Sequence, residues 1–149
     1  DGRRPDAVEV GTLLDDLKRR DFTMNAIAMD KDDNLIDPFN GKRDILWRRI
    51  KCVGNAEDRI REDALRALRA IRFSITKKFV VDADIIGALH SDWLPPLLST
   101  VSAERRREEL DKCFKVNTLE TLDWFAYLPV SFKEAVFTDG LRLKPTMEA

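Results

Sequence analysis

Carboxylates and guanidinium groups are spaced along residues 62–69 so that a helix would bring them onto one face. Glu62 and Asp63 lie four and three residues before Arg66, which are the spacings of neighbours on a helix surface. A carboxylate accepts from an exocyclic amine and a guanidinium donates to ring nitrogens, so Asp63 and Arg66 can present a Watson–Crick-like edge to a base. Arg69 and Arg72 follow and can serve phosphates. The alternative is an ordinary solvated helix face with ion pairs.

A second polar cluster precedes this segment, in the run Lys18-Arg19-Arg20-Asp21-Phe22-Thr23-Met24-Asn25. Two adjacent arginines followed by Asp21 and Asn25 would suit contacts to a triphosphate and a ribose. Local ion pairs and turn capping by Asp21 and Asn25 would explain the same pattern.

The elements that must position these residues follow from the spacing of apolar side chains. Ile60, Leu68 and Ile75 belong to a three- and four-residue repeat that predicts one continuous helix over 56–76. Asp63 and the arginines fall on the opposite face of that helix. Further helices are predicted at 82–90, at 103–116 with Ser102 as N-cap, at 118–127 and at 132–137, with a break at Pro95.

The first third of the chain has a mixed pattern. We expect a short strand at 7–10 after an Arg-Arg-Pro turn, a helix at 13–18, a hairpin of 27–30 with 34–37, a helix at 42–46 and a strand at 50–53. The fold class predicted is therefore α+β, with a small α+β part over 1–54 and an all-α part over 55–149.

Composition excludes several classes of protein. The 149 residues include 26 Lys+Arg against 27 Asp+Glu, so a uniformly basic nucleic-acid binder is excluded and any polyanion site must be a local patch. Basic residues cluster at 3–4, 18–20, 42–49, 59–72 and 105–107. No apolar run approaches the roughly 20 residues of a membrane-spanning helix.

Metal, disulfide and targeting signals are absent from the sequence. One His and the widely separated Cys52 and Cys113 argue against a zinc site or a disulfide framework. The N-terminus has no apolar targeting segment, and we expect a cytoplasmic protein. It also has no starting Met, which leads us to expect a piece of a longer chain.

Four segments, in order, resemble the motifs of one enzyme family, the class II (bacterial-type) tRNA nucleotidyltransferases, or CCA-adding enzymes. These belong to the wider tRNA nucleotidyltransferase/poly(A) polymerase family. Residues 16–30 (DLKRRDFTMNAIAMD) resemble motif B, and residues 37–44 (DPFNGKRD) are similar to motif C. Residues 62–73 (EDALRALRAIRF) look like motif D with its EDxxR template, and residues 104–112 (ERRREELDK) match the later ERxxxExxK motif.

This resemblance implies a division of the chain. Residues 1–54 would be the C-terminal part of a nucleotidyltransferase head, 55–116 a helical neck that selects the nucleotide, and 117–149 the start of a helical body. In this family the head also carries a motif A whose carboxylates hold two Mg²⁺ ions. The chain contains no Gly-Gly segment followed by Val-Arg-Asp, which marks motif A, so the resemblance places the catalytic carboxylates upstream, none in this chain, and the N-terminal head segment becomes an expected partner.

The resemblance also implies a reaction and residue roles. CMP and AMP from CTP and ATP would be added to the tRNA 3′ end. The residues expected to bind the nucleotide are Arg20, Asp21 and Asn25 at the triphosphate and ribose, Asp63 and Arg66 at the base, Glu62 orienting Arg66, and Arg69 and Arg72 at phosphate or neighbouring template residues. The residues expected to bind tRNA are Arg105, Arg106 and Lys112.

Two departures and three alternatives remain. Asn40 stands where the family usually has Gly in motif C, and Lys78 stands where Gly usually precedes the Phe after motif D. The helix that carries motif D is therefore expected to end differently.

A poly(A) polymerase shares RRDFT and EDxxR, although Asn25-Ala26 favours the CCA-adding enzymes because poly(A) polymerases typically have Asn-Ser there. A CC-adding or A-adding enzyme, and a non-catalytic RNA-binding module, are the other readings.

Overall fold

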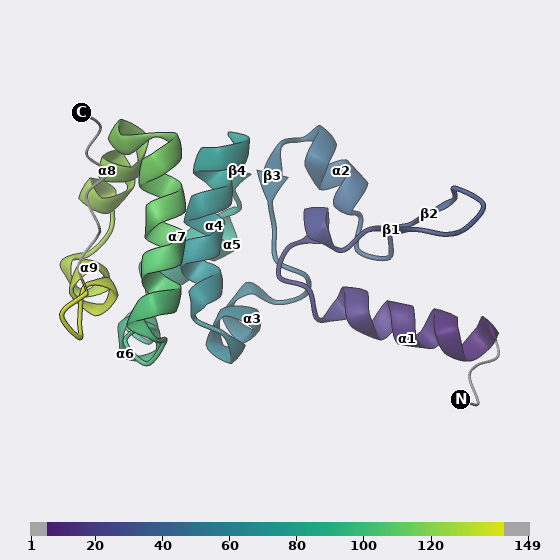
Figure 1. The fold of residues 1–149 in the computed structure, drawn as a ribbon, viewed down its shortest axis with the longest axis horizontal. Helices are drawn as coiled ribbons and strands as arrows, with labels where there is room; N and C mark the ends of the chain where they lie inside the picture. The colour runs from purple at the N-terminus through teal and green to yellow at the C-terminus, as the bar shows by residue number, and fades with distance from the viewer. Residues whose placement is uncertain (1–5, 142–149) are drawn as a thin grey trace.

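The computed structural model describes residues 6–141, and side chains over residues 12–141. It is an elongated arrangement, with the N-terminal helix at one end and the last helices at the other (Figure 1). The predicted strand at 7–10 is wrong, because those residues belong to a helix that runs to Lys18. The predicted turn at 3–5 lies outside the described residues.

The first part of the fold combines short helices with a hairpin. The hairpin pairs Ala28 with Ile36 and Met29 with Leu35 in antiparallel register, as the sequence predicted. In order, the elements are α1 (Asp6–Lys18), the 3₁₀ turn η1 (Thr23–Asn25), β1 (Ala28–Met29), β2 (Leu35–Ile36), α2 (Gly41–Leu46) and β3 (Arg49–Ile50).

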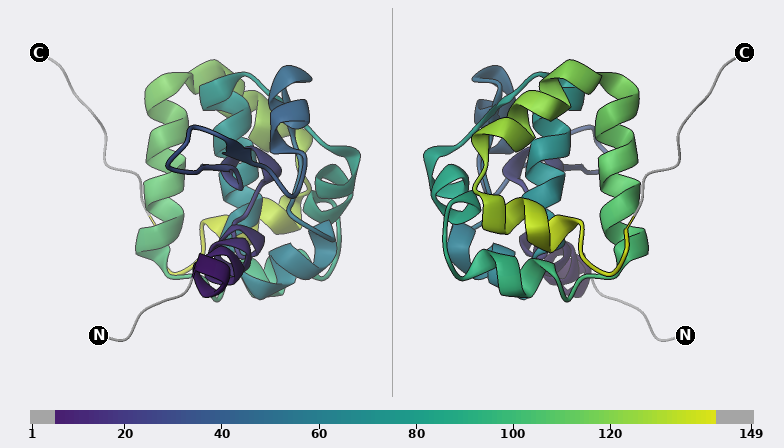
Figure 2. Two further views of the ribbon diagram at one scale, coloured as in Figure 1. Left: turned by 90° about the vertical axis from the view of Figure 1, so that its right-hand side faces the viewer. Right: turned by 90° about the vertical axis from the view of Figure 1, so that its left-hand side faces the viewer.

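The second part is mostly helical, and α4 is its centre. This helix packs against α3, α5, α7 and α8, which surround it in the end-on views (Figure 2). Its apolar side, including Leu68, Ile71 and Ile75, is buried. Each such side chain contributes roughly 1.5–3 kcal/mol through burial. The elements are α3 (Ala56–Glu62), α4 (Leu65–Lys77), β4 (Val80–Val81), α5 (Ala83–Leu89), α6 (Leu94–Leu98), α7 (Ala103–Val116), α8 (Thr118–Tyr127) and α9 (Val130–Val136).

The predicted continuous helix over 56–76 is wrong in one place. Asp63 is extended, with φ −149° and ψ 98°, so α3 ends at Glu62 and α4 begins at Leu65. The Asp63 carboxylate accepts a hydrogen bond from the Leu65 amide at 3.2 Å. The Asp63 side chain thus satisfies the first amide of α4, which the helix start leaves unpaired, and this local bond stabilises a break that apolar periodicity does not show.

A pair of strands joins the two predicted parts. β3 pairs in parallel with β4, Arg49 with Val80 and Ile50 with Val81. The part predicted as all-α over 55–149 therefore contains a strand, and that strand completes a sheet begun in the first part. The α+β class itself is confirmed.

Prolines and left-handed residues account for the other differences. Pro95 and Pro96 do not break the chain but occupy the first turn of α6, where a missing amide proton costs little. Asn40 and Lys78, at the two positions where the family usually has Gly, both have φ of 59°. Lys78 ends α4 in the left-handed conformation that Gly adopts most easily.

Candidate functional site

An open cleft gathers most of the residues that the sequence predicted to bind a nucleotide. It has a volume of about 510 Å³ and lies where the loop after α1 meets the α3–α4 break. Six of the eight predicted residues line it, and Glu62 and Arg72 do not. The lining residues are Arg20, Asp21, Asn25, Asp63, Arg66, Arg69 and Phe73.

The wall formed by residues 20–25 is a turn held by its own side chains. Asp21 is almost buried, and its Oδ1 accepts from the Phe22 amide at 2.7 Å and from Asn25 Nδ2 at 3.3 Å. Arg20 donates to the Asn25 carbonyl at 3.1 Å and pairs with Asp16 at 2.9 Å. The turn capping anticipated for Asp21 is therefore present, and it fixes the backbone beside the cleft.

Arg69 connects this turn to α4. Its Nε and Nη2 atoms both lie 2.6 Å from Asp21 Oδ2, a fork contact that holds a carboxylate in a defined orientation. The guanidinium also lies over the Phe73 ring, 5.2 Å from its centroid. Because Asp21 is occupied by Arg69 and by the turn, it positions the cleft wall and leaves little of its carboxylate free.

Asp63 lies at the helix break and faces α7. Its Oδ2 is 3.3 Å from Nη2 of Arg105, a residue 42 positions later. The Asp63 side chain is 34% exposed and that of Arg105 is 53% exposed, so solvent screens this contact and it contributes little. Asp63 can therefore exchange Arg105 for another hydrogen-bond donor in the cleft.

Arg66 is held from three sides. It donates to the Arg59 carbonyl at 2.7 Å, to Glu62 at 3.3 Å and, through Nη2, to the Arg19 carbonyl at 3.3 Å. The predicted contact of Glu62 with Arg66 is confirmed. The predicted meeting of all three side chains on one helix face is wrong, because the break gives Asp63 and Arg66 different partners.

Arg59 is a residue of this network that the sequence did not single out. Its Nη2 donates to the carbonyls of Arg19 and Arg20, both at 2.8 Å, and its Nη1 pairs with Glu62 at 2.6 Å. Its Nε is buried and has no hydrogen-bond partner in the structure. Arg59 joins the loop after α1 to α3 at the edge of the cleft. Its position in the basic run 59–72 was the only signal in the sequence.

Three predicted residues lie away from the cleft. Arg72 pairs with the buried Glu109 of α7 at 2.5 Å and so joins two helices of the core. Lys112 is exposed and lies 3.8 Å from the same carboxylate. Arg106 is fully buried and donates to carbonyls of Val101, Ala135 and Val136, among others. The prediction that Arg106 contacts tRNA is therefore wrong, because its charge is used inside the protein.

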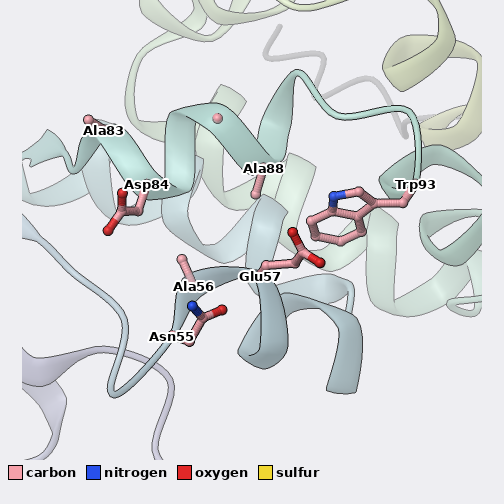
Figure 3. Close-up of a pocket in the computed structure, with 8 residues that line it drawn as sticks. Asn55, Ala56, Glu57, Ala83, Asp84, Ala88 and Trp93 are labelled. Carbon is pink, nitrogen blue, oxygen red and sulfur yellow. The ribbon is translucent and has the colours of Figure 1, made fainter.

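A second hollow lies between α3 and α5 (Figure 3). It has a volume of about 340 Å³, and Asn55, Glu57, Asp84 and Trp93 are among its lining residues. It contains none of the predicted nucleotide-binding residues. Beside it, Arg61 pairs with Glu57 at 2.9 Å and lies 4.3 Å from the centre of the Trp93 ring.

Among the part of the chain that the structure describes, no group of three or more His, Cys, Asp or Glu side chains could hold a metal ion. No helix among those residues is long and apolar enough to cross a membrane.

Comparison with known proteins shows which family the chain resembles. Residues 1–51 match the model of the poly A polymerase head domain. The CCA-adding enzyme of Geobacillus kaustophilus strain HTA426 is 45% identical over 137 residues, 87% of this chain and 33% of that enzyme. That of Geobacillus stearothermophilus is 50% identical over 113 residues, 75% of this chain and 28% of that enzyme. The chain is therefore similar to CCA-adding enzymes over most of its length and to the poly A polymerase head domain over residues 1–51.

Solved structures of this family share the fold of the chain. The Bacillus stearothermophilus CCA-adding enzyme in complex with CTP superimposes with a TM-score of 0.72 at 44% identity, over 78% of this chain and 29% of that one. A CCA-adding enzyme in complex with ATP gives a TM-score of 0.75 at 31% identity, over 88% of this chain and 31% of that one. The chain spans about a third of the length of the curated relatives it matches.

Proposed function

We propose that this chain selects and positions the nucleotide in a tRNA nucleotidyltransferase that adds CMP and AMP, from CTP and ATP, to the tRNA 3′ end. One observation carries the proposal. Residues from two motifs about 40 positions apart in the sequence converge on a single cleft of about 510 Å³. Related enzymes of the same fold have been solved with CTP and with ATP.

The base would lie against Asp63 and Arg66. CTP and ATP both present an exocyclic amine beside a ring-nitrogen acceptor, which match a carboxylate acceptor and a guanidinium donor. UTP and GTP present a carbonyl in place of the amine, and a carbonyl facing the Asp63 carboxylate is repulsive. The cleft would therefore select nucleotides both by attracting CTP and ATP and by repelling UTP and GTP. Arg66 is preorganised for this role, because Glu62 and two carbonyls already fix its guanidinium.

The ribose and triphosphate would lie along the other wall. Arg20 is about half exposed, and its partner Asp16 is exposed too, so its guanidinium is free to turn to a phosphate. Asn25 supplies an amide for the ribose. Asp21 and Arg69 lock each other and act by shaping the wall.

In this reaction the terminal 3′-hydroxyl of tRNA attacks the α-phosphate and pyrophosphate leaves. The family relies on Mg²⁺ for that step, and the described residues of this chain contain no group of three or more His, Cys, Asp or Glu side chains that could hold the ion. The cleft residues would bind and orient the nucleotide.

The division into a head part over 1–54, a neck over 55–116 and the start of a body over 117–149 is part of the proposal. The N-terminal head segment, which would hold the metal, is the partner it requires. Arg105 and Lys112 are exposed on α7, so both side chains are accessible to tRNA. Arg105 would then leave Asp63 when the base arrives.

Binding of the four ribonucleoside triphosphates, measured by titration calorimetry on the wild-type chain and on Asp63→Ala, tests the assignment. We expect the wild type to prefer CTP and ATP by about 5- to 150-fold, the range for one good polar pair, and the variant to lose most of that preference. Asp58→Ala is the matched control, because Asp58 is an exposed carboxylate of α3 outside the cleft. A variant that rejects UTP and GTP as strongly as the wild type would contradict the template role.

A poly(A) polymerase is the second candidate, favoured by the family model that matches residues 1–51. That enzyme would use ATP alone, so tight binding of CTP separates the two. A CC-adding or A-adding enzyme would share this cleft and differ in the product. A non-catalytic RNA-binding module would bind none of the four nucleotides in the cleft.

A further inference from the structure

An exposed tryptophan at the end of α2 is surrounded by cations. Trp47 is 62% exposed, although burying an indole ring ordinarily contributes strongly to stability. The guanidinium carbon of Arg43 lies 5.2 Å from the ring centroid and that of Arg49 lies 5.0 Å from it. Both distances are in the range of cation–π attraction. We call Lys42, Arg43, Trp47, Arg48 and Arg49 the Trp47 patch.

The patch has no exposed negative charge of its own. Residues 42–51 contain five cationic side chains and one carboxylate, that of Asp44. Asp44 is fully buried and accepts hydrogen bonds from Thr23 at 2.6 Å and from Arg49 at 2.8 and 3.2 Å. Within residues 12–141 the exposed side chains of Lys42 and Arg48 have no ion-pair partner.

The backbone holds the patch in place. The Trp47 amide donates to the Arg43 carbonyl at 2.9 Å and closes α2. Arg48 follows in the left-handed region with φ of 52°, which turns the chain directly into β3. Arg49 is anchored by Asp44. The backbone at Trp47 and the side chain of Arg49 are therefore restrained before binding, which lowers the loss of conformational freedom there.

The contact of Trp93 with an arginine offers a comparison for the Trp47 patch. Arg61 over Trp93 is also a cation–π contact, but Arg61 has its own carboxylate partner, Glu57, at 2.9 Å, whereas Arg43 and Arg49 share the single buried carboxylate of Asp44. The cations of a helix C-terminus are favourable by themselves, so the dipole of α2 accounts for part of the charge. The dipole does not explain why the Trp47 side chain is exposed to solvent.

We propose that the Trp47 patch binds a single strand of RNA, with a base stacked on Trp47 and phosphates on Arg48 and Lys42. Proteins that bind single strands combine a cationic track with aromatic rings, because every base offers a π face. The buried Asp44 links the patch through Thr23 to η1, the turn whose Asn25 lines the nucleotide cleft. The patch is therefore connected to the cleft wall through the hydrogen bond of Thr23 with Asp44. The proposal rests on the proposed function only in taking RNA as the partner.

The test uses a fluorescein-labelled single-stranded RNA of mixed sequence and follows its anisotropy at several salt concentrations. Trp47→Ala should weaken binding on the order of 10- to 100-fold, the loss expected for one stacked base. Arg48→Gln should reduce the slope of log K against log salt by about 0.7, since one phosphate contact is lost. Trp93→Ala is the matched control and should change affinity less than twofold.

Two further measurements separate the outcomes. In a Trp93→Phe/Trp124→Phe background, Trp47 is the only tryptophan, and RNA but not CTP should quench its fluorescence. CTP affinity of Trp47→Ala should equal that of the wild type. If the wild-type chain does not bind CTP, the proposed function is wrong, whereas the proposal that the Trp47 patch binds RNA is unaffected.

Three results would overturn the proposal. The first is equal RNA affinity for Trp47→Ala and Trp93→Ala, with both variants folded by circular dichroism. The second is a salt slope unchanged by Arg48→Gln. The third concerns Leu46, which is 72% exposed beside the patch. If Leu46→Ala abolishes binding to anionic phospholipid vesicles while Trp47→Ala leaves RNA binding intact, the surface serves a membrane.

Discussion

Replacing Arg59 with methionine tests the network that supports one wall of the cleft. Methionine keeps much of the apolar stem of the side chain and removes the three hydrogen bonds to Glu62 and to the carbonyls of Arg19 and Arg20. The pair with Glu62 contributes little, because the Glu62 side chain is 55% exposed. Each carbonyl bond to a charged donor contributes roughly 1.5–3 kcal/mol. Removing the unpaired Nε returns about 1 kcal/mol, so we expect a net loss of about 2–5 kcal/mol.

Arg61→Met is the matched control for this variant. Arg61 lies two residues away on the same helix, and its side chain and that of its partner Glu57 are both about half exposed. Its loss should cost less than about 1 kcal/mol. Urea unfolding followed by far-UV circular dichroism gives both free energies, and an unchanged slope against urea shows that the unfolded states are comparable.

Nucleotide affinity gives the second readout. Arg59→Met frees the Arg19–Arg20 segment, so CTP should bind about tenfold more weakly, which corresponds to about 1.4 kcal/mol. Arg59→Lys keeps one charged donor and should recover part of the stability without restoring both carbonyl contacts. Equal unfolding free energies for Arg59→Met and Arg61→Met would refute the reasoning. So would an unchanged CTP affinity in a variant that is clearly destabilised.

Three other predictions concern stability. Gly41→Ala should destabilise the fold by roughly 1–3 kcal/mol in urea unfolding, because a Cβ there would lie 2.0 Å from the Thr23 carbonyl; a smaller loss would mean that η1 can move. Lys78→Gly should gain up to about 1 kcal/mol by relieving the left-handed conformation, and a loss would contradict that account. Burial raises the pKa of the Cys52 and Cys113 thiols from 9.0 to about 12, so their contribution to stability is complete below pH 9 and should fall as pH rises from 9 to 12. A pH titration of the unfolding free energy against a Cys52→Ala/Cys113→Ala variant checks this, and identical slopes would refute it.

Local signals in the sequence predicted most of the helices. The helix over 103–116 begins after Ser102, whose side chain accepts from the Arg105 amide, and the helix over 118–127 has the predicted bounds. Both have a strong capping residue at the start. The hairpin was predicted from its Asp and Asn turn residues, and Asp30 indeed accepts from the amides of Asp32 and Asn34.

Signals that depend on distant contacts were not visible. β4 exists because Val80 and Val81 pair with β3, about 30 residues earlier, and a two-residue strand has no periodicity of its own. Arg106 resembles part of a basic surface in the sequence, because no pattern reveals its partners, which are carbonyls near 101 and 135–138 and the carboxylate of Asp139. A guanidinium group can be buried when carbonyl and carboxylate oxygens accept its donors, so basic runs alone do not define a surface.

In the candidate site, local signals predicted the residues, but contacts between distant residues decide their arrangement. Motif spacing predicted the cleft residues but placed Asp63 and Arg66 on one continuous helix face. The break separates them: Asp63 caps α4 and faces Arg105, whereas Arg66 is fixed by backbone carbonyls from α3 and from the loop after α1. A carboxylate at a helix break can change partners without unwinding a turn, while the guanidinium beside it stays rigid. That combination of one fixed donor and one exchangeable acceptor fits the proposed selection of CTP and ATP.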